Sequence, residues 1–434
     1  MKSLLALLLC CAALSAEAGV KIQHWVAPSG ARVYFVETHT LPMLDVQVDF
    51  PAGGAYAPAD KAGLAGLTNG LMDAGAGSLN EEQIAERRAD LGVRLSETSD
   101  GDRAGMVLRT LSARTERDAA IDLLRTLLTQ PTFPADVLAR EKARTIASIQ
   151  EADTRPDAIA AKRFAAALYP DHPYGRSADA ASIERITRED LVAFHKEHYT
   201  AHGAVVSMIG DLTRAEAEAI AQRITEGLPA GSAAPTLPPV KMPAAGRVDV
   251  AHPAAQSHIH VGLPALKRGD PDFYALQVGN YVLGGGGFVS RLMNEVREKR
   301  GLVYDVHSYF SPRVLEGPFE IGLQTKREQA GEALKVVNQV LADYLRTGPT
   351  AAELKAAQQN MADGLALRID SNAKLLGFIS AIGYFGLPLD YLDNYAQKVR
   401  AVTAQQVREA FARHVKPEHL VTVVVAGDDA KPVQ

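Results

Sequence analysis

The sequence predicts an α+β fold made of two homologous halves, each a mixed or antiparallel sheet with helices packed on one side. Three observations lead to this prediction: strands and helices alternate in hairpin-like order, the order recurs in the second half, and a proline-rich stretch separates the repeats. This mixed order favours an α+β sheet over a doubly wound parallel sheet. A chain of 434 residues also has room for two to four domains.

The first 18 residues have the pattern of a cleaved signal peptide. Lys2 supplies the positive charge, residues 4–14 are apolar, and Ala16-Glu17-Ala18 forms an Ala-x-Ala cleavage site. The apolar stretch is shorter than the ~20 residues that cross a bilayer as a helix, and no other segment is long and apolar enough to span one. We therefore expect secretion into the periplasm and no membrane span.

The only two cysteines, Cys10 and Cys11, lie inside this segment, so the processed chain is expected to have no disulfide and no Cys-bound metal. A lipid-anchored cysteine is the alternative, but Leu9 and Cys10 are poor neighbours for lipoprotein cleavage. With 47% hydrophobic residues, 22% charged residues and a net charge of −5, the composition is that of a globular protein without a basic face for nucleic acid.

The first half shows strands with period-two alternation and longer helices with an amphipathic pattern. The expected strands are residues 31–37, 44–50, 94–98 and 106–112, and the expected helices are residues 81–91, 116–128 and 135–152. In the second half, Thr350 and Glu353 form a capping box that opens a helix over residues 351–367.

An internal repeat relates the two halves. In each, a Thr begins an amphipathic helix that leads to an apolar strand and then to a Gly-Asp pair; near the start of each half, a strand ends at a proline. The matching segments are Ile186-Thr187 with strand 204–209 and Gly210-Asp211, Val402-Thr403 with strand 420–426 and Gly427-Asp428, and strands 44–50 and 258–263 before Pro51 and Pro264.

The stretch from 228 to 247 holds five prolines and little periodicity, which predicts an extended linker. We therefore divide the chain into a signal peptide (1–18), a first half (19–228), a linker (229–247) and a second half (248–434).

Motifs spread through the processed chain resemble the peptidase family of pitrilysin, insulin-degrading enzyme and the mitochondrial processing peptidase. The compact bacterial two-subunit members are the most similar. The motifs are Ala62-Gly63-Leu64-Ala65, Leu91-Gly92, Ala167-Leu168-Tyr169-Pro170, His172-Pro173-Tyr174-Gly175, Tyr199 with Gly210-Asp211, Ser290-Arg291-Leu292 and the run from Arg297 to Tyr304. The resemblance implies a clam-like arrangement of the two halves and a homologous partner subunit.

The zinc motif of that family, His-x-x-Glu-His, corresponds here to Gly66-Leu67-Thr68-Asn69-Gly70. In the family, the two His bind zinc with a later Glu, and the motif Glu activates water. Glycine offers no ligand and asparagine accepts no proton near neutral pH. The later Glu is expected in the helix around residues 145–149, where neither Ala147 nor Ser148 replaces a carboxylate. We expect no catalytic residue and no metal in this chain, which would be inactive alone, and zinc in the partner subunit.

A second signature survives at Arg297 and Tyr304. The resemblance implies that this pair binds the substrate carbonyl next to the scissile bond. A guanidinium and a phenol both donate hydrogen bonds, and donors aimed at a developing negative charge stabilise it. The alternative is structural: Arg297 belongs to a solvated charged helix face and Tyr304 begins a buried strand.

Three other patterns suggest sites and have simpler explanations. His195-Lys196-Glu197-His198 looks like a compressed zinc motif, but it ends a helix, where we expect cations or surface polar groups. His258 and His260 share a strand face near His252, and we expect no carboxylate beside them. The run Gly284 to Gly287 lacks the Gly-Lys-Ser/Thr of a phosphate loop and predicts a tight turn.

Together these features predict a non-catalytic subunit of a periplasmic heterodimeric zinc metallopeptidase. Arg297 and Tyr304 would bind and polarise the peptide, and the strand over residues 94–98 would pair with its backbone. The alternative is a non-enzymatic scaffold or binding protein built on the same fold. A peptidase with other catalytic residues is a third possibility, but no Ser-His-Asp or Cys arrangement supports it.

Overall fold

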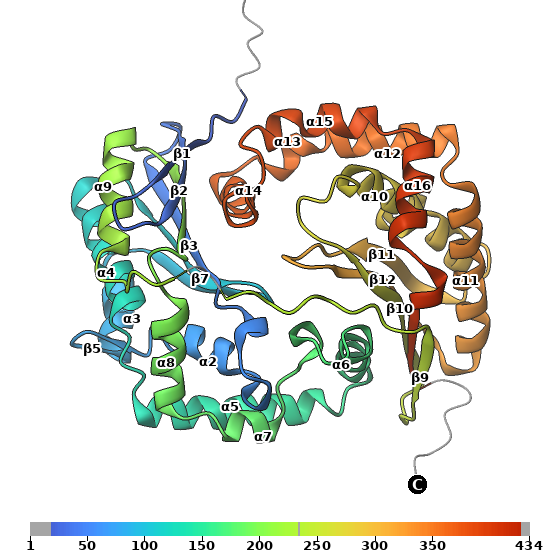
Figure 1. The fold of residues 1–434 in the computed structure, drawn as a ribbon, viewed down its shortest axis with the longest axis horizontal. Coiled ribbons are helices and arrows are strands. Elements are labelled where there is room, and N and C mark those ends of the chain that lie inside the picture. The colour runs from blue at the N-terminus through green and yellow to red at the C-terminus, as the bar shows by residue number, and fades with distance from the viewer. Residues whose placement is uncertain (1–18, 233–234, 427–434) are drawn as a thin grey trace, which may run out of the picture.

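A computed structural model describes residues 19–232 and 235–426 (Figure 1). The predicted signal peptide and the pair Gly427-Asp428 lie outside these ranges. The described chain forms two halves, each built on one main sheet, and mixes helices with both parallel and antiparallel strand pairs. The predicted fold class is confirmed.

The first half contains a six-stranded sheet, a small two-stranded sheet and the helices packed around them. Its strands are β1 (Gln23–Val26), β2 (Arg32–Glu37), β3 (Met43–Phe50), β4 (Gly75–Ala76), β5 (Leu79–Asn80), β6 (Arg94–Ser99), β7 (Ala104–Leu111) and β8 (Val205–Gly210). Its helices are α2 (Leu64–Gly70), α3 (Glu81–Asp90), α4 (Arg114–Thr129), α5 (Ala135–Ala152), α6 (Pro156–Leu168), α7 (Ala180–Glu184), α8 (Arg188–His198) and α9 (Arg214–Thr225).

The second half contains a five-stranded sheet and a larger share of helix. Its strands are β9 (Gly246–Val250), β10 (Gln256–Leu266), β11 (Val303–Phe310), β12 (Gly317–Lys326) and β13 (Val421–Val425). Its helices are α10 (Phe273–Asn280), α11 (Ala330–Thr347), α12 (Ala351–Asp363), α13 (Leu365–Arg368), α14 (Asn372–Phe385), α15 (Tyr391–Ala401) and α16 (Ala404–His414).

The two main sheets have the same strand order once the extra edge strand β1 is set aside. The orders are β2-β8-β3-β7-β6 in the first half and β9-β13-β10-β12-β11 in the second. In both, the outer pair is parallel and the remaining pairs are antiparallel. The internal repeat predicted from β3 with β10 and from β8 with β13 is therefore confirmed.

Each half lends one helix to the sheet of the other half, which the sequence did not predict (Figure 1). Helix α14 buries Leu376, Ile379 and Ile382 against Val205 and Ile209 of the first sheet. Helix α6 packs in the same way on the second sheet, where its apolar residues meet alternate valines of β13. The halves therefore share apolar core, and neither sheet is fully covered by its own half.

Polar contacts reinforce this exchange. Ser380 on α14 donates to Asp49 Oδ2 at 2.7 Å and accepts from Arg103 Nη1 at 2.6 Å. The hydroxyl of Tyr384, also on α14, donates to the carbonyl of Asp102 at 2.8 Å. Asp49 is fully buried, and this burial raises its pKa, while Arg103 and the hydrogen bonds from Ser380 and Gln47 act in the opposite direction.

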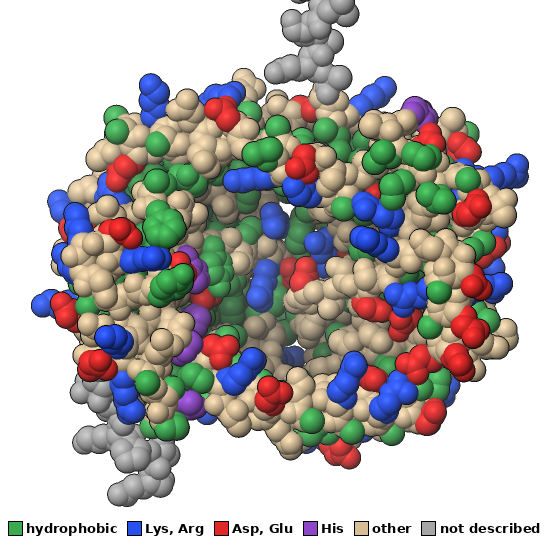
Figure 2. Space-filling model, turned by 180° about the vertical axis from the view of Figure 1, so that it is seen from behind, with side chains coloured by type: hydrophobic (Ala, Val, Ile, Leu, Met, Phe, Trp, Pro, Cys, Tyr) green, Lys and Arg blue, Asp and Glu red, His purple; other side chains and the backbone are tan. Residues whose placement is uncertain are grey.

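The surface is hollowed between the two halves, and Lys and Arg side chains are prominent around this central hollow (Figure 2). Within the described ranges, no helix combines the length and the apolar character needed to cross a bilayer.

Candidate functional site

Helix α2 carries the positions that correspond to the zinc motif. It begins after Gly63, whose φ of 102° favours glycine, and it buries Leu64 and Leu67 in the first core. Gly66 and Gly70 lie on the exposed side of the helix, and a Cβ built on either meets no atom within 4 Å. The structure thus leaves room for side chains at both positions, and the sequence supplies none.

Asn69, at the position of the general base, is buried, and both polar atoms of its side chain bond to the fold. Its Nδ2 donates to the carbonyl of Thr98 at 3.1 Å, and its Oδ1 accepts from the hydroxyl of Tyr199 at 3.0 Å. Burial raises the pKa of Tyr199, so the phenol remains a donor. Asn69 therefore connects α2 to the edge strand β6 and to the end of α8.

The region expected to hold the third ligand is also without one. On α5, Ala147 and Ser148 are exposed, while Ile146 and Ile149 pack against the first core. Between residues 146 and 149, the two isoleucines pack on the core and the two exposed residues offer no carboxylate.

A carboxyl pair beside α2 was missed by the sequence analysis. Asp73 follows the helix and forms an ion pair with Arg88 at 2.9 Å. Burial, and then the neighbouring Glu97 of β6, raises the pKa of Asp73 to about 6. Glu97 lies on β6, the edge strand of the sheet, which the resemblance suggests as the peptide-binding strand. The protonation of Asp73 therefore changes the charge beside this strand.

Arg297 and Tyr304 lie together in the second half. Arg297 belongs to a π-helical turn, Met293–Glu298, and Gly301 with a φ of 61° then reverses the chain into β11. The Nη1 of Arg297 donates to the carbonyl of Tyr304 at 2.5 Å, and its Cζ lies 4.8 Å from the centre of the Tyr304 ring. The two residues are therefore held as one unit.

The side chain of Tyr304 points into solvent, with 82% of its surface exposed. The pairing of β11 with β12 shifts between Val303 and Val306, so a bulge at Tyr304 re-aims its ring. The structural alternative, in which Tyr304 begins a buried strand, is wrong for this residue.

Two apolar neighbours of the pair were missed by the sequence analysis. Phe288 and Val289 are 64% and 71% exposed, and the guanidinium of Arg297 lies 4.8 Å from the Phe288 ring centre. Arg297 thus contacts both the Phe288 and the Tyr304 rings, a cation-π arrangement that fixes the guanidinium. An exposed apolar pair directly after a glycine run was the signal available in the sequence.

The histidines of His195-Lys196-Glu197-His198 are not surface groups, so that expectation is wrong. His195 Nε2 and His198 Nδ1 each lie 2.9 Å from a backbone carbonyl, of Leu128 and Pro51 respectively. Both side chains are buried, and burial lowers the pKa of each. They are neutral core residues whose ring nitrogens bond to the backbone.

A carboxylate does lie beside the second histidine group, contrary to expectation. Glu320 of β12 approaches His260 of β10 at 2.6 Å, while His252 lies 3.0 Å from the carbonyl of Thr154. His258 is half-buried, and burial lowers its pKa.

The glycine run forms the predicted tight turn. A Cβ at Gly284 would lie 2.6 Å from the backbone nitrogen of Ser308, and one at Gly286 would lie 2.6 Å from the carbonyl of Tyr281. Only glycine allows this close approach of backbone to backbone.

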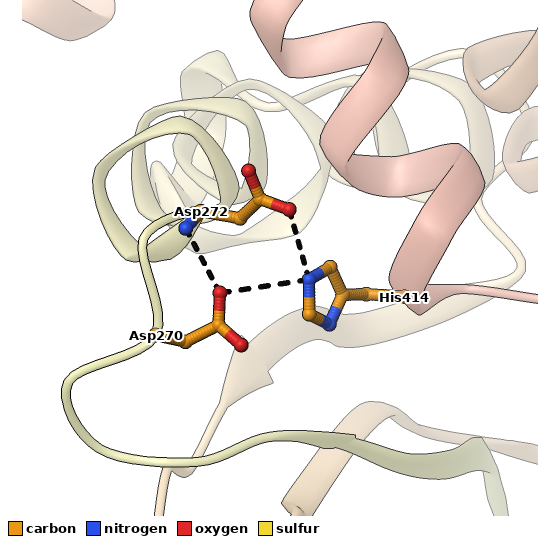
Figure 3. A group of neighbouring side chains, drawn as sticks. All are labelled: Asp270, Asp272 and His414. Atoms are coloured by element: carbon orange, nitrogen blue, oxygen red, sulfur yellow. Dashed lines mark hydrogen bonds and ion pairs between the residues drawn. The ribbon is translucent and has the colours of Figure 1, made fainter.

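Asp270, Asp272 and His414 form the one three-residue group in the described chain that has the spacing of a metal site (Figure 3). His414 Nε2 lies 3.0 Å from Asp272 and 3.7 Å from Asp270. The carboxylate of Asp272 also accepts two hydrogen bonds from Arg413, both at 2.8 Å. Since Arg413 already neutralises this carboxylate, the group acts as an ion-pair cluster that joins the start of α10 to the end of α16.

Family models match both halves of the chain. Residues 32–181 match the model described as Insulinase (Peptidase family M16), and residues 185–361 match the model described as Peptidase M16 inactive domain. Together they cover the described chain from β2 to α12.

Individual relatives agree with these matches. A crystal structure of a peptidase M16 inactive domain from Pseudomonas fluorescens superposes with a TM-score of 0.91 at 37% identity, covering 95% of this chain and 100% of that chain. The non-peptidase homolog YmxG of Helicobacter pylori is 24% identical over 98% of this chain and 99% of its own length. An uncharacterized zinc protease of Mycobacterium tuberculosis is 28% identical over 68% of each chain.

A more distant solved structure shows the fold alone. The periplasmic protease PqqL of Escherichia coli superposes with a TM-score of 0.80 at 18% identity, and the match covers 94% of this chain but 45% of PqqL.

Proposed function

This chain belongs to the insulinase family of peptidases, and from that premise we propose that it is the non-catalytic subunit of a periplasmic heterodimeric zinc metallopeptidase. In this assembly a homologous partner carries His-x-x-Glu-His and the zinc. This chain contributes Arg297 and Tyr304, which bind the peptide and polarise its carbonyl.

The observation that carries the proposal is the arrangement of the Arg297 and Tyr304 pair. A tyrosine with 82% of its surface exposed contributes little to its own core, yet a bulge and a cation-π contact hold it in place. Such preorganisation is what a donor needs if it is to stabilise charge on a substrate oxygen. Arg297 uses its Nη1 on the Tyr304 carbonyl, and its Nε lies 3.5 Å from the carboxylate of Glu298. Its Nη2 forms no hydrogen bond or ion pair among the described residues and is the group we expect to donate to a ligand.

The first half explains why the chain would need a partner. Its two exposed glycines provide no ligand, and the amide of Asn69 is committed to Thr98 and Tyr199. The zinc of the partner would supply the activated water. The similarity of this chain to 45% of PqqL supports pairing, because a single polypeptide can hold about two units of this size.

Peptide backbone could add to the edge strand β6. This strand lies at the end of the first sheet, so the backbone groups on its outer side have no strand partner among the described residues. Addition of a strand to such an edge is a common way to bind extended peptides. The amide of Asn69, which holds Thr98, would keep the edge aligned with α2.

Steady-state kinetics of the purified complex test the proposal. Tyr304→Phe removes one donor, and we expect kcat to fall about 10²- to 10³-fold, as for loss of one oxyanion donor. Arg297→Ala should act in the same direction. Tyr309→Phe, on the same strand, is the matched control. Unchanged turnover in both variants, with the complex intact, would contradict the role of the pair.

The alternative function is a scaffold or binding protein on the same fold. A scaffold has no use for a preorganised donor pair, so the two functions differ at Arg297 and Tyr304. Double substitution of these residues would leave a scaffold's binding unchanged and would abolish peptide turnover by a heterodimer.

A further inference from the structure

A cavity in the second half is lined by neither Arg297 nor Tyr304 and takes no part in the proposed function. It lies between the loop that joins β10 to α10 and the loop that joins α14 to α15, and its volume is about 300 Å³. This is the lower end of the range for small-molecule sites. Its apolar walls are Phe273, Tyr274, Leu387 and Tyr391.

The charged groups at this cavity are unbalanced. Arg268 and Lys398 line it, together with one acid, Asp270. Asp270 already accepts a hydrogen bond from the backbone of Asp272 and faces His414 (Figure 3). The cavity therefore presents two cations. Its one carboxylate, Asp270, is already engaged with Asp272 and His414.

Arg268 is the unusual member of this set. Its Nε is buried without an acceptor, and within residues 19–232 and 235–426 none of its guanidinium nitrogens forms a hydrogen bond or an ion pair. Its contact is with the Phe385 ring, whose centre lies 5.2 Å from Cζ. Burial is the main cause that lowers its pKa. Asp100 and Asp102 act on this guanidinium only as charges, without a direct contact. A half-buried guanidinium without a hydrogen-bond or ion-pair partner is costly, and its planar fork matches a carboxylate.

Lys398 places a second cation at the same cavity. Its Nζ lies 5.4 Å from the centre of the Tyr274 ring, and in the described chain no carboxylate forms an ion pair with it. The rings of Tyr274 and Tyr391 lie 6.3 Å apart and form an aromatic wall. The cavity thus combines an apolar body with cations that lack partners.

We propose that this cavity binds a monocarboxylate with an apolar body, its carboxylate at Arg268 and Lys398 and its body against Phe273, Tyr274 and Tyr391. Two sources share this chemistry: a free aromatic or aliphatic acid, and the C-terminal residue of an apolar peptide. Arg268 supplies the directional hydrogen bonds and Lys398 adds charge.

Isothermal titration calorimetry of the purified chain tests the proposal with 3-phenylpropanoate and its neutral analogue 3-phenylpropanamide. The acid should bind, and the amide should bind at least about tenfold more weakly, since a charged hydrogen bond is lost. Equal binding of the two, or no binding of the acid at millimolar concentration, would overturn the proposal. A peptide ending in Phe, with a free or an amidated C-terminus, distinguishes the two sources.

Variants locate the binding. Arg268→Gln should weaken the acid about tenfold or more, while Lys355→Gln, an exposed lysine on α12, should leave binding unchanged. Should Arg268→Gln fail to fold, Lys398→Gln at an exposed position should still weaken binding about two- to fivefold. If Lys355→Gln weakened binding of the acid as much as Arg268→Gln or Lys398→Gln did, the assignment of the cavity would be overturned.

The ligand-free protein offers an independent readout. Because Arg268 is half-buried and forms no hydrogen bond or ion pair in the described chain, Arg268→Met should raise the melting temperature in the absence of ligand. A lowered melting temperature would mean that the guanidinium stabilises the fold by itself, and it would count against a binding role.

Discussion

The segment around α2 in the first half and the segment around Arg297 in the second half show how differently two related halves can be used. Both halves have the same strand order. In the first, the exposed positions of α2 are glycines, and its two polar side chains, Thr68 and Asn69, are buried and bond to the fold. In the second, Arg297 and Tyr304 are positioned by the fold and left accessible.

The packing of this fold therefore does not depend on the chemistry of its site. The first core closes around Leu64 and Leu67 whatever stands at the exposed positions of α2. The glycines at these positions supply no metal ligand, and the buried face of α2 still packs in the core. The second half then carries the features that still require a functional explanation.

The largest expected effect concerns the helices that the halves exchange. Ile379→Ala on α14 and Phe164→Ala on α6 each remove a buried side chain, and each should lower the free energy of unfolding by about 2–5 kcal/mol. Because each helix covers the other half's sheet, urea unfolding should remain a single transition.

Leu367→Ala is the control, because Leu367 is 73% exposed. It should change the free energy of unfolding by less than about 0.5 kcal/mol. Two separate transitions, with only one shifted by each variant, would show that the halves are not coupled through α6 and α14.

Asn69→Ala should have the next largest effect. It removes the donor to Thr98 and leaves the buried hydroxyl of Tyr199 without its acceptor, at a cost of about 1–3 kcal/mol. Urea denaturation measures it, with the exposed Asn338→Ala on α11 as the matched control. An unchanged stability would mean that Asn69 is not a structural replacement for the general base.

The acid pair beside α2 predicts a pH dependence. The folded-state pKa of Asp73 is raised from 3.8 to about 6, so its contribution to stability is complete below about pH 4 and is lost as the pH rises through 6. Asp73→Asn should remove this dependence. The stability of the wild type relative to the variant should therefore fall between pH 4 and 6.

Glu97→Gln should flatten the same dependence, since Glu97 is the charged group that contributes most to raising the pKa of Asp73. If the stability of the wild type relative to Asp73→Asn instead rose between pH 4 and 6, the ion pair with Arg88 would outweigh burial in setting the pKa of Asp73.

The smallest effect tests the open face of α2. Gly66→Ala should stabilise the protein by about 0.5–1 kcal/mol, because alanine favours the helix and its Cβ would meet no atom within 4 Å. Gly105→Ala is the contrasting control, since its Cβ would overlap the carbonyl of Val48. A destabilised Gly66→Ala would contradict an open face.

The sequence predicted the local elements well where one pattern decides the structure. The helix over residues 135–152 matches α5, and the capping box at Thr350 is present, with Glu353 accepting from the Thr350 nitrogen at 2.7 Å. The helix after it ends early, because α12 stops at Asp363 and Gly364 introduces the short α13. Strand β3 begins and ends within one residue of its predicted range.

Tertiary choices were beyond the sequence. Helix α14 is apolar on most of its surface, and such a pattern does not say which sheet it covers. The partners of Asn69 lie 29 and 130 residues away along the chain. The outward turn of Tyr304 depends on a bulge set by its pairing with β12. The sequence therefore showed which residues stand at the site, but it did not show which residues surround them in the fold.

The proposed heterodimer is tested by affinity purification of the tagged full-length protein from cells of its own organism, with mass spectrometry and zinc analysis of the eluate. We expect a stoichiometric homologous partner that carries His-x-x-Glu-His, with about one zinc per pair. Recovery of this chain alone, without a homologous partner, would contradict it, and zinc bound to the chain alone would show that its ligands lie elsewhere.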